Sequence, residues 1–93
     1  MIKSFACRHT RALHEQNVAH KDFRSFGRQA KKKLNMLHAA VEYRDLASPP
    51  GNRLETLKGT RKGQSSIRIN DQWRLCFRWN DGHAYDAEIC DYH

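Results

Sequence analysis

The segment from residue 73 to residue 79 constrains the fold more than any other part of the chain. Apolar side chains alternate there with arginine and cysteine, in the order Trp73, Arg74, Leu75, Cys76, Phe77, Arg78 and Trp79. Strict alternation predicts a half-buried β-strand whose aromatic side faces a core. The arginine side is then left on the opposite side of the sheet, and it needs a separate explanation.

Two further segments predict the neighbouring strands. Segment 65–70 alternates Ile67 and Ile69 with polar residues, and Asp81-Gly82 is a strong signal of a hairpin turn into a last strand. In that last strand we expect one side of the sheet to carry Tyr85, Ala87 and Ile89. The other side is expected to carry Asp86, Glu88, Cys90 and Tyr92. Short extended segments at 2–5 and 54–58 bring the expected sheet to about five strands.

Two helices are predicted before these strands. The first covers about residues 8–16, and the second follows Asp22, a plausible N-cap. The second helix has an apolar stripe at Phe26, Ala30, Leu34, Leu37 and Val41. A loop at 45–53 contains both prolines. This order predicts an α+β fold, with two N-terminal helices packed on a mainly antiparallel sheet, in a single domain over residues 1–93.

The chain is strongly basic. It carries 17 lysine and arginine residues against 10 aspartate and glutamate, a net charge of +7. This charge favours a polyanionic partner, such as nucleic acid or an acidic protein. Lys31 and Lys32 lie on the outer face of the second helix, which suits solvent, a phosphate backbone or an acidic partner. Arg78 is expected to pair with an acid across the strands, which leaves other arginines for phosphate.

Cysteines, histidines and hydropathy narrow the class of protein. The three cysteines, Cys7, Cys76 and Cys90, lack CxxC spacing, which favours buried reduced thiols over a Cys76–Cys90 pair. The histidines form no ligand-spaced cluster, so we expect neither a metal nor another cofactor. No apolar run suits a signal peptide or a membrane span, so the expected location is cytoplasmic, away from membranes.

The remaining side chains suit metal-independent RNA cleavage. Attack by the 2′-hydroxyl needs a base, an acid for the leaving 5′ oxygen, and fixed cations near the phosphate. The candidate cations are Lys58, Arg68 and Arg74, and the candidates for proton transfer are Glu55, Asp91, Tyr92 and His93. The glycine-flanked turn 59–63 adds Arg61 and Lys62 as phosphate contacts, although it lacks the spacing of a P-loop.

Four motifs extend over nearly the whole chain: MIKSF, PPGNRLETLKG, SIRINDQWRLCFRW and the final DYH. In these motifs the chain resembles the HigB branch of the RelE/ParE toxin superfamily, also described as plasmid maintenance system killer proteins. The resemblance implies the toxin of a type II toxin–antitoxin pair, an endoribonuclease that cleaves translated mRNA on the 70S ribosome. It also implies a HigA-like helix-turn-helix antitoxin as partner, and it places active-site positions at Lys58, Arg74, Asp91, Tyr92 and His93.

One departure from the family pattern bears on the chemistry. Some relatives carry a histidine shortly before the lysine of LKG, where this chain has Glu55 and Thr56. Glu55 is therefore a candidate acid or base. Two other functions stay open: a ParE-like toxin that inhibits DNA gyrase by binding, and a general basic RNA-binding domain. The polar DYH tail favours the nuclease, because a toxin that only binds needs no acid–base set.

Overall fold

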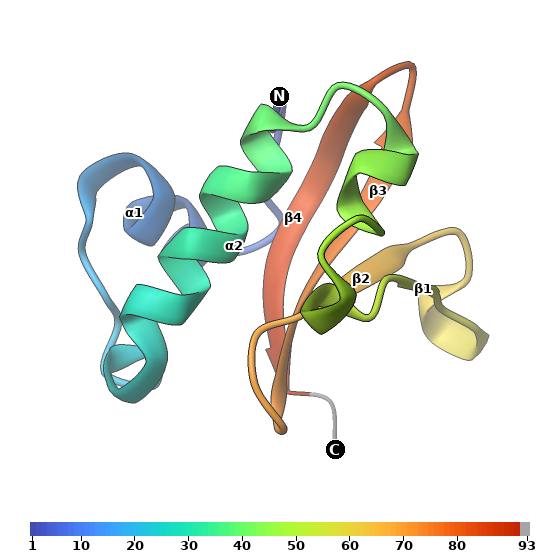
Figure 1. Ribbon diagram of the computed structural model, residues 1–93. Helices are drawn as coiled ribbons and strands as arrows, with labels where there is room; N and C mark the ends of the chain where they lie inside the picture. Colours follow the sequence, from blue (N-terminus) through green and yellow to red (C-terminus); the bar gives the residue numbers. More distant parts are fainter. Residues whose placement is uncertain (92–93) are drawn as a thin grey trace.

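A four-stranded antiparallel sheet with both helices on one side forms the molecule (Figure 1). The computed structural model describes residues 1–91. The strands are β1 (Glu55–Thr56), β2 (Ser65–Arg68), β3 (Trp73–Asn80) and β4 (His83–Asp91), and they lie side by side in that order. Each strand therefore pairs with the one before it in the chain, and the predicted α+β class is confirmed.

The helical segments lie mostly before the sheet. The α-helices are α1 (Arg8–Gln16) and α2 (Gly27–Ala39), and the short 3-10 turns are η1 (Arg24–Phe26), η2 (Tyr43–Leu46), η3 (Pro50–Asn52) and η4 (Gly59–Arg61). Within residues 1–91, the helices are too short or too polar to span a lipid bilayer.

The core lies between the helices and the apolar side of β3, as its alternation predicts. Leu75 and Phe77 are fully buried there, and so are Leu34 and Leu37 of α2. Trp73 closes one end of the core, where its ring stacks on Phe26 with 5.1 Å between ring centroids. Burial of large apolar side chains on both layers supplies most of the driving force for this packing.

The expected count of about five strands is wrong, because two extended segments are shorter than predicted. Near the N-terminus only isolated parallel bridges form, from Ile2 to Ala84 and from Phe5 to Ala87. The strand expected at 54–58 is reduced to Glu55–Thr56. Between the two bridges, the amide of Asp86 donates to the Ser4 hydroxyl at 2.9 Å, so a side chain interrupts the backbone ladder.

The predicted start and end of the second helix are also wrong. Asp22 does not cap it, since η1 intervenes and α2 begins only at Gly27, without a side-chain cap. The Asp22 amide instead donates to His20 Nδ1 at 3.2 Å, which keeps Asp22 in the preceding turn. Val41 lies past the end of α2 and is 73% exposed, so it contributes nothing to the buried stripe.

A β-bulge in β4 corrects one further expectation. The register shifts between Cys76 and Arg78, opposite Asp86, whose φ of 54° is left-handed. An inserted residue moves the following side chains to the other side of a strand. Tyr85 therefore pairs with Arg78 on the arginine side, instead of sharing the core side with Ala87.

Candidate functional site

The side of the sheet that faces away from the helices has a hollow of about 280 Å³. Its lining residues are Leu57, Lys58, Thr60, Arg61, Cys76, Cys90 and Asp91. Lys58 and Arg61 come from the turn before β2, and Asp91 comes from the end of β4. Three predicted site residues, two from one turn and one from the end of β4, therefore line one concave surface.

The turn between β1 and β2 delivers the two cations. Backbone bonds from Arg61 to Lys58 (3.4 Å) and from Lys62 to Gly59 (3.1 Å) close it tightly. Gly63 then returns the chain to the sheet with a φ of 92°, a conformation that a residue with a Cβ rarely adopts. Lys58 is exposed at the hollow, and Lys62 is exposed but does not line it.

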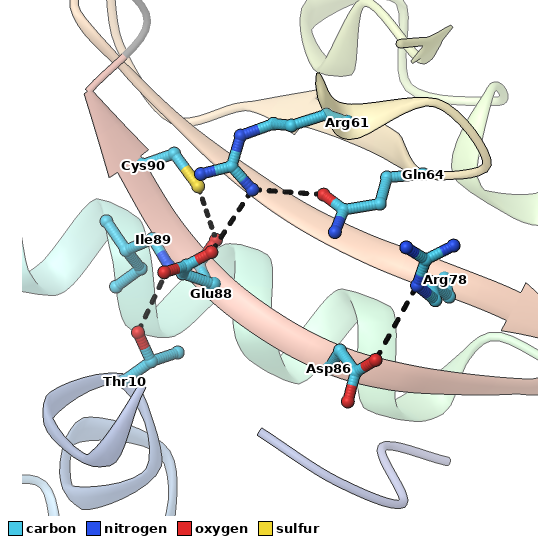
Figure 2. A network of polar contacts seen from close by, with 8 residues as sticks. All are labelled: Thr10, Arg61, Gln64, Arg78, Asp86, Glu88, Ile89 and Cys90. Carbon is cyan, nitrogen blue, oxygen red and sulfur yellow. Dashed lines mark hydrogen bonds and ion pairs between the residues drawn. The ribbon is translucent and has the colours of Figure 1, made fainter. Parts of the chain in front are cut away.

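Arg61 reaches from this turn across the sheet to β4 (Figure 2). Its Nη1 donates to Glu88 Oε1 at 3.1 Å and to Gln64 Oε1 at 3.0 Å. Burial opposes the charge of this guanidinium, but the proximity of Cys90 and the hydrogen bond to Glu88 outweigh burial and raise the pKa of Arg61. Arg61 is thus a fixed cation at any physiological pH.

Cys76 and Cys90 form a neighbouring part of the wall, and both are buried and unoxidised, as expected. Cys76 pairs with Glu88 and Cys90 with Arg74, so both thiols lie on the arginine side. A hydrogen bond from Cys90 lowers the pKa of Cys76, while the same contact and burial raise the pKa of Cys90. Cys76 is therefore the more easily ionised thiol of the pair.

Arg74 departs most from its prediction, because it is only 6% exposed instead of lying on an open sheet surface. Its Nε donates to Ser66 Oγ at 2.7 Å, and its Nη2 donates to the Arg53 carbonyl at 2.5 Å. Glu55 lies 3.7 Å from the Arg74 Nε. Arg74 and Glu55 are therefore brought together as predicted site residues, with the arginine buried and the glutamate partly exposed.

The other two arginines of this side each pair with an acid. Arg78 Nε lies 3.6 Å from Asp86 Oδ2, which confirms the predicted cross-strand pair. Arg68 shares the side with its register partner Arg74 and forms an ion pair with Asp71. Asp91 accepts a hydrogen bond from Gln72 Nε2 at 2.9 Å.

Lys31 and Lys32 do not approach this hollow. They line a second hollow, of about 570 Å³, between α1 and α2. The Lys31 ammonium donates to the carbonyl of His14. Because both helices cover the opposite side of the sheet (Figure 1), these lysines belong to a separate surface.

Tyr92 and His93 lie outside the described residues. In residues 1–91, no group of three or more histidine, cysteine or acidic side chains is arranged to hold a metal ion. Two carboxylates are possible proton acceptors: Asp91 lines the hollow, and Glu55 lies near Arg74 without lining it.

Several residues that hold the predicted arginines were not themselves predicted as site residues. Glu88 and Gln64 hold Arg61, and Ser66 holds Arg74. The alternation in segment 65–70 placed Ser66 on the side of Arg68, which was a usable signal. No local pattern reveals that Gln64 and Glu88 meet at one arginine, because the two residues are far apart in the chain.

Comparisons with known proteins agree with the fold and add a family. A family model described as the RelE-like toxin of type II toxin–antitoxin system HigB matches residues 3–93. Toxin HigB-1 of Vibrio cholerae serotype O1 (strain ATCC 39315 / El Tor Inaba N16961) is 55% identical over 58 residues, which are 62% of this chain and 61% of that protein. Endoribonuclease HigB of Proteus vulgaris is 31% identical over 93 residues, the full length of both chains.

A solved structure shares the fold at low sequence identity. The YoeB–YefM complex from Staphylococcus aureus contains a chain with a TM-score of 0.61 and 22% identity, and the match covers 100% of this chain and 98% of that one. At this identity the similarity concerns the fold alone.

Proposed function

The chain belongs to the RelE-like HigB toxins of type II toxin–antitoxin systems, and from this premise we propose that it is a metal-independent endoribonuclease. Its substrate is mRNA that is being translated on the 70S ribosome, and its action stops protein synthesis. The name of the Proteus vulgaris relative, Endoribonuclease HigB, supports the activity. The observation that carries the proposal is the hollow that gathers Lys58, Arg61 and Asp91.

The proposed reaction is attack of the RNA 2′-hydroxyl on the adjacent phosphate, which releases a 5′-hydroxyl and leaves a 2′,3′-cyclic phosphate. Lys58 and Arg61 stabilise the negative charge that builds on the phosphate oxygens. Arg74 supports the site from its buried position next to Glu55. Asp91 or Glu55 accepts the proton of the 2′-hydroxyl, and Tyr92 or His93 protonates the leaving oxygen.

The partner of the toxin is an antitoxin, as in every type II pair. We propose that it is a HigA-like helix-turn-helix protein and that both proteins are cytoplasmic. Arg68 and Lys62 extend the phosphate-binding surface beyond the hollow. Lys31 and Lys32 are still predicted to contact phosphate, on a separate surface away from the cleavage site.

Mapping mRNA 5′ ends after brief induction tests the activity. Wild type should produce new ends inside translated codons, and Lys58→Ala should reduce them about 10- to 100-fold, because a charge-assisted contact to the phosphate is lost. Lys58 is exposed, so this change should leave the fold intact. Lys3→Ala removes the same charge from an exposed position outside the hollow, and it should cleave like wild type.

Intact mRNA after wild-type induction, with growth arrest and disturbed DNA supercoiling, would reject the nuclease and indicate inhibition by binding. Equal cleavage by wild type and Lys58→Ala would support the nuclease activity but reject the hollow as its active site.

A further inference from the structure

Two arginine–acid pairs lie on the arginine side of the sheet and look alike in isolation (Figure 2). Arg61 contacts Glu88 at 3.1 Å, and Arg78 contacts Asp86 at 3.6 Å. Only the first pair adjoins the hollow, because Arg61 lines it and Arg78 does not. The two pairs therefore provide a matched comparison of an ion pair at the proposed site and one away from it.

The contacts of Arg61 use one end of its guanidinium. Both acceptors, Glu88 Oε1 and Gln64 Oε1, bind Nη1, which has two N–H groups. Among residues 1–91, no hydrogen bond is found from Nε or Nη2 of Arg61. These two nitrogens form the side of the planar group that binds two oxygens of a phosphate at once.

The position of the guanidinium follows from the same contacts. Arg61 starts from a turn, and an arginine side chain has many rotamers that would leave its head in solvent. Holding Nη1 with two acceptors fixes the plane of the group. Figure 2 shows the guanidinium beside the sulfur of Cys90, which is itself part of the wall of the hollow.

We propose that Glu88 is a positioning residue, which holds Arg61 through Nη1 so that Nε and Nη2 present a bidentate fork to a phosphate of the RNA strand. Gln64 assists it by accepting from the same nitrogen. The inference rests on the proposed ribonuclease function, and it adds a role for an acidic residue inside a site that binds an anion.

Glu88 also has an opposing effect, because its negative charge repels the phosphate. Removal of the side chain would strengthen RNA binding if repulsion were its only influence, and would weaken it if positioning dominates. Glutamine separates the two effects, since its amide oxygen can accept the same hydrogen bond without the charge.

The test compares kcat/KM for mRNA cleavage on purified ribosomes for five variants of the full chain. Arg61→Ala should lower kcat/KM about 30-fold. Glu88→Ala should lower it about 10-fold, which is the usual size of the loss when a residue that orients a substrate-binding group is removed. Glu88→Gln should stay within about 3-fold of wild type, because the accepted hydrogen bond is kept. The double variant Arg61→Ala/Glu88→Ala should be no worse than Arg61→Ala alone.

Asp86→Asn is the matched control, since it neutralises the acid of the Arg78 pair, and asparagine tolerates the left-handed backbone at this bulge. It should cleave like wild type. Thermal unfolding of each variant checks that lost cleavage is not lost folding.

Equal or higher kcat/KM for Glu88→Ala than for wild type would overturn the inference, because Glu88 would then not aid cleavage by positioning Arg61. Equal losses in Glu88→Ala and Glu88→Gln would also overturn it, because the charge itself would be needed. If wild type fails to cleave mRNA, the proposed function fails instead. Binding of a short single-stranded RNA then decides the positioning role, with the same order of variants expected.

Discussion

The two sides of the sheet are built by different means, although they share the same backbone. On the helix side, Leu75 and Phe77 are fully buried against α2. On the other side, Arg74 and Arg61 are held by hydrogen bonds to residues from several segments. The first side is organised by apolar burial and the second by pairwise polar contacts, so a change on one side need not disturb the other.

This difference shows how a small chain can carry a charged site without losing its core. Every second residue of β3 faces the core, and the residues between them face the arginine side of the sheet. Adjacent positions in β3 should therefore respond differently to the same truncation.

Phe77→Ala and its neighbour Arg78→Ala give the largest expected contrast. Loss of the fully buried Phe77 ring should lower the free energy of unfolding by about 4 kcal/mol, from lost transfer energy and the cavity left behind. Arg78→Ala should cost less than about 1 kcal/mol, because its ion pair with Asp86 is half-exposed. Urea unfolding of the two variants measures both values. Similar losses would show that the arginine side contributes as much to stability as the buried core side.

Arg74→Ala should break the simple division between the sides. Arg74 lies on the polar side, yet it is as buried as a core residue. Truncation to alanine removes its contacts with Ser66, Glu55 and the Arg53 carbonyl. We expect a loss of about 3 kcal/mol in the free energy of unfolding. Reduced cleavage by this variant would therefore combine a folding effect with a site effect.

Arg74→Lys separates these two effects. Lysine keeps the positive charge beside Glu55 but cannot reproduce the planar fork that spans Ser66 and Arg53. It should recover part of the stability lost in Arg74→Ala, as measured by urea unfolding. A lysine variant no more stable than Arg74→Ala would mean that charge contributes little at this position.

The sequence predicted the helix side of the molecule well, because burial leaves a local pattern. The alternation around Leu75 and Phe77, and the stripe through Leu34 and Leu37, are readable from neighbouring residues alone. The errors occurred where a side chain or a bulge decides the backbone. The Ser4 side chain interrupts the strand pairing expected for segment 2–5. The bulge at Asp86, with its left-handed backbone, moves the Tyr85 side chain to the arginine side of the sheet.

The site was less predictable, because its contacts join distant segments. Lys58, Arg61 and Asp91 were named from residue type and resemblance, and the fold brings them to one hollow. The burial of Arg74 could not be read from alternation, since it depends on a carbonyl from the loop at Arg53. The same reason hides Glu88 as the partner of Arg61.

The smallest expected effect concerns a polar group on the helix side, His14 of α1. Its ring packs against Phe5 and His38, and its Nδ1 is buried without a hydrogen-bond partner in residues 1–91. Burial, and then the nearby Lys31 and His38, lower the pKa of His14 below its ordinary value of 6.5. The neutral ring is therefore the form that the fold accepts.

Stability should consequently fall on mild acidification. Below pH 6.5 the unfolded chain takes up a proton at His14 before the folded chain does, so acid favours unfolding until the lowered folded pKa is reached. His14→Leu should remove this contribution and give a flatter dependence of the urea midpoint on pH between neutrality and about pH 5. Carboxylates titrate in both proteins and cancel in the difference. If the two profiles are parallel, the helix side tolerates the charge, and the contrast between the two sides of the sheet is weaker than their burial suggests.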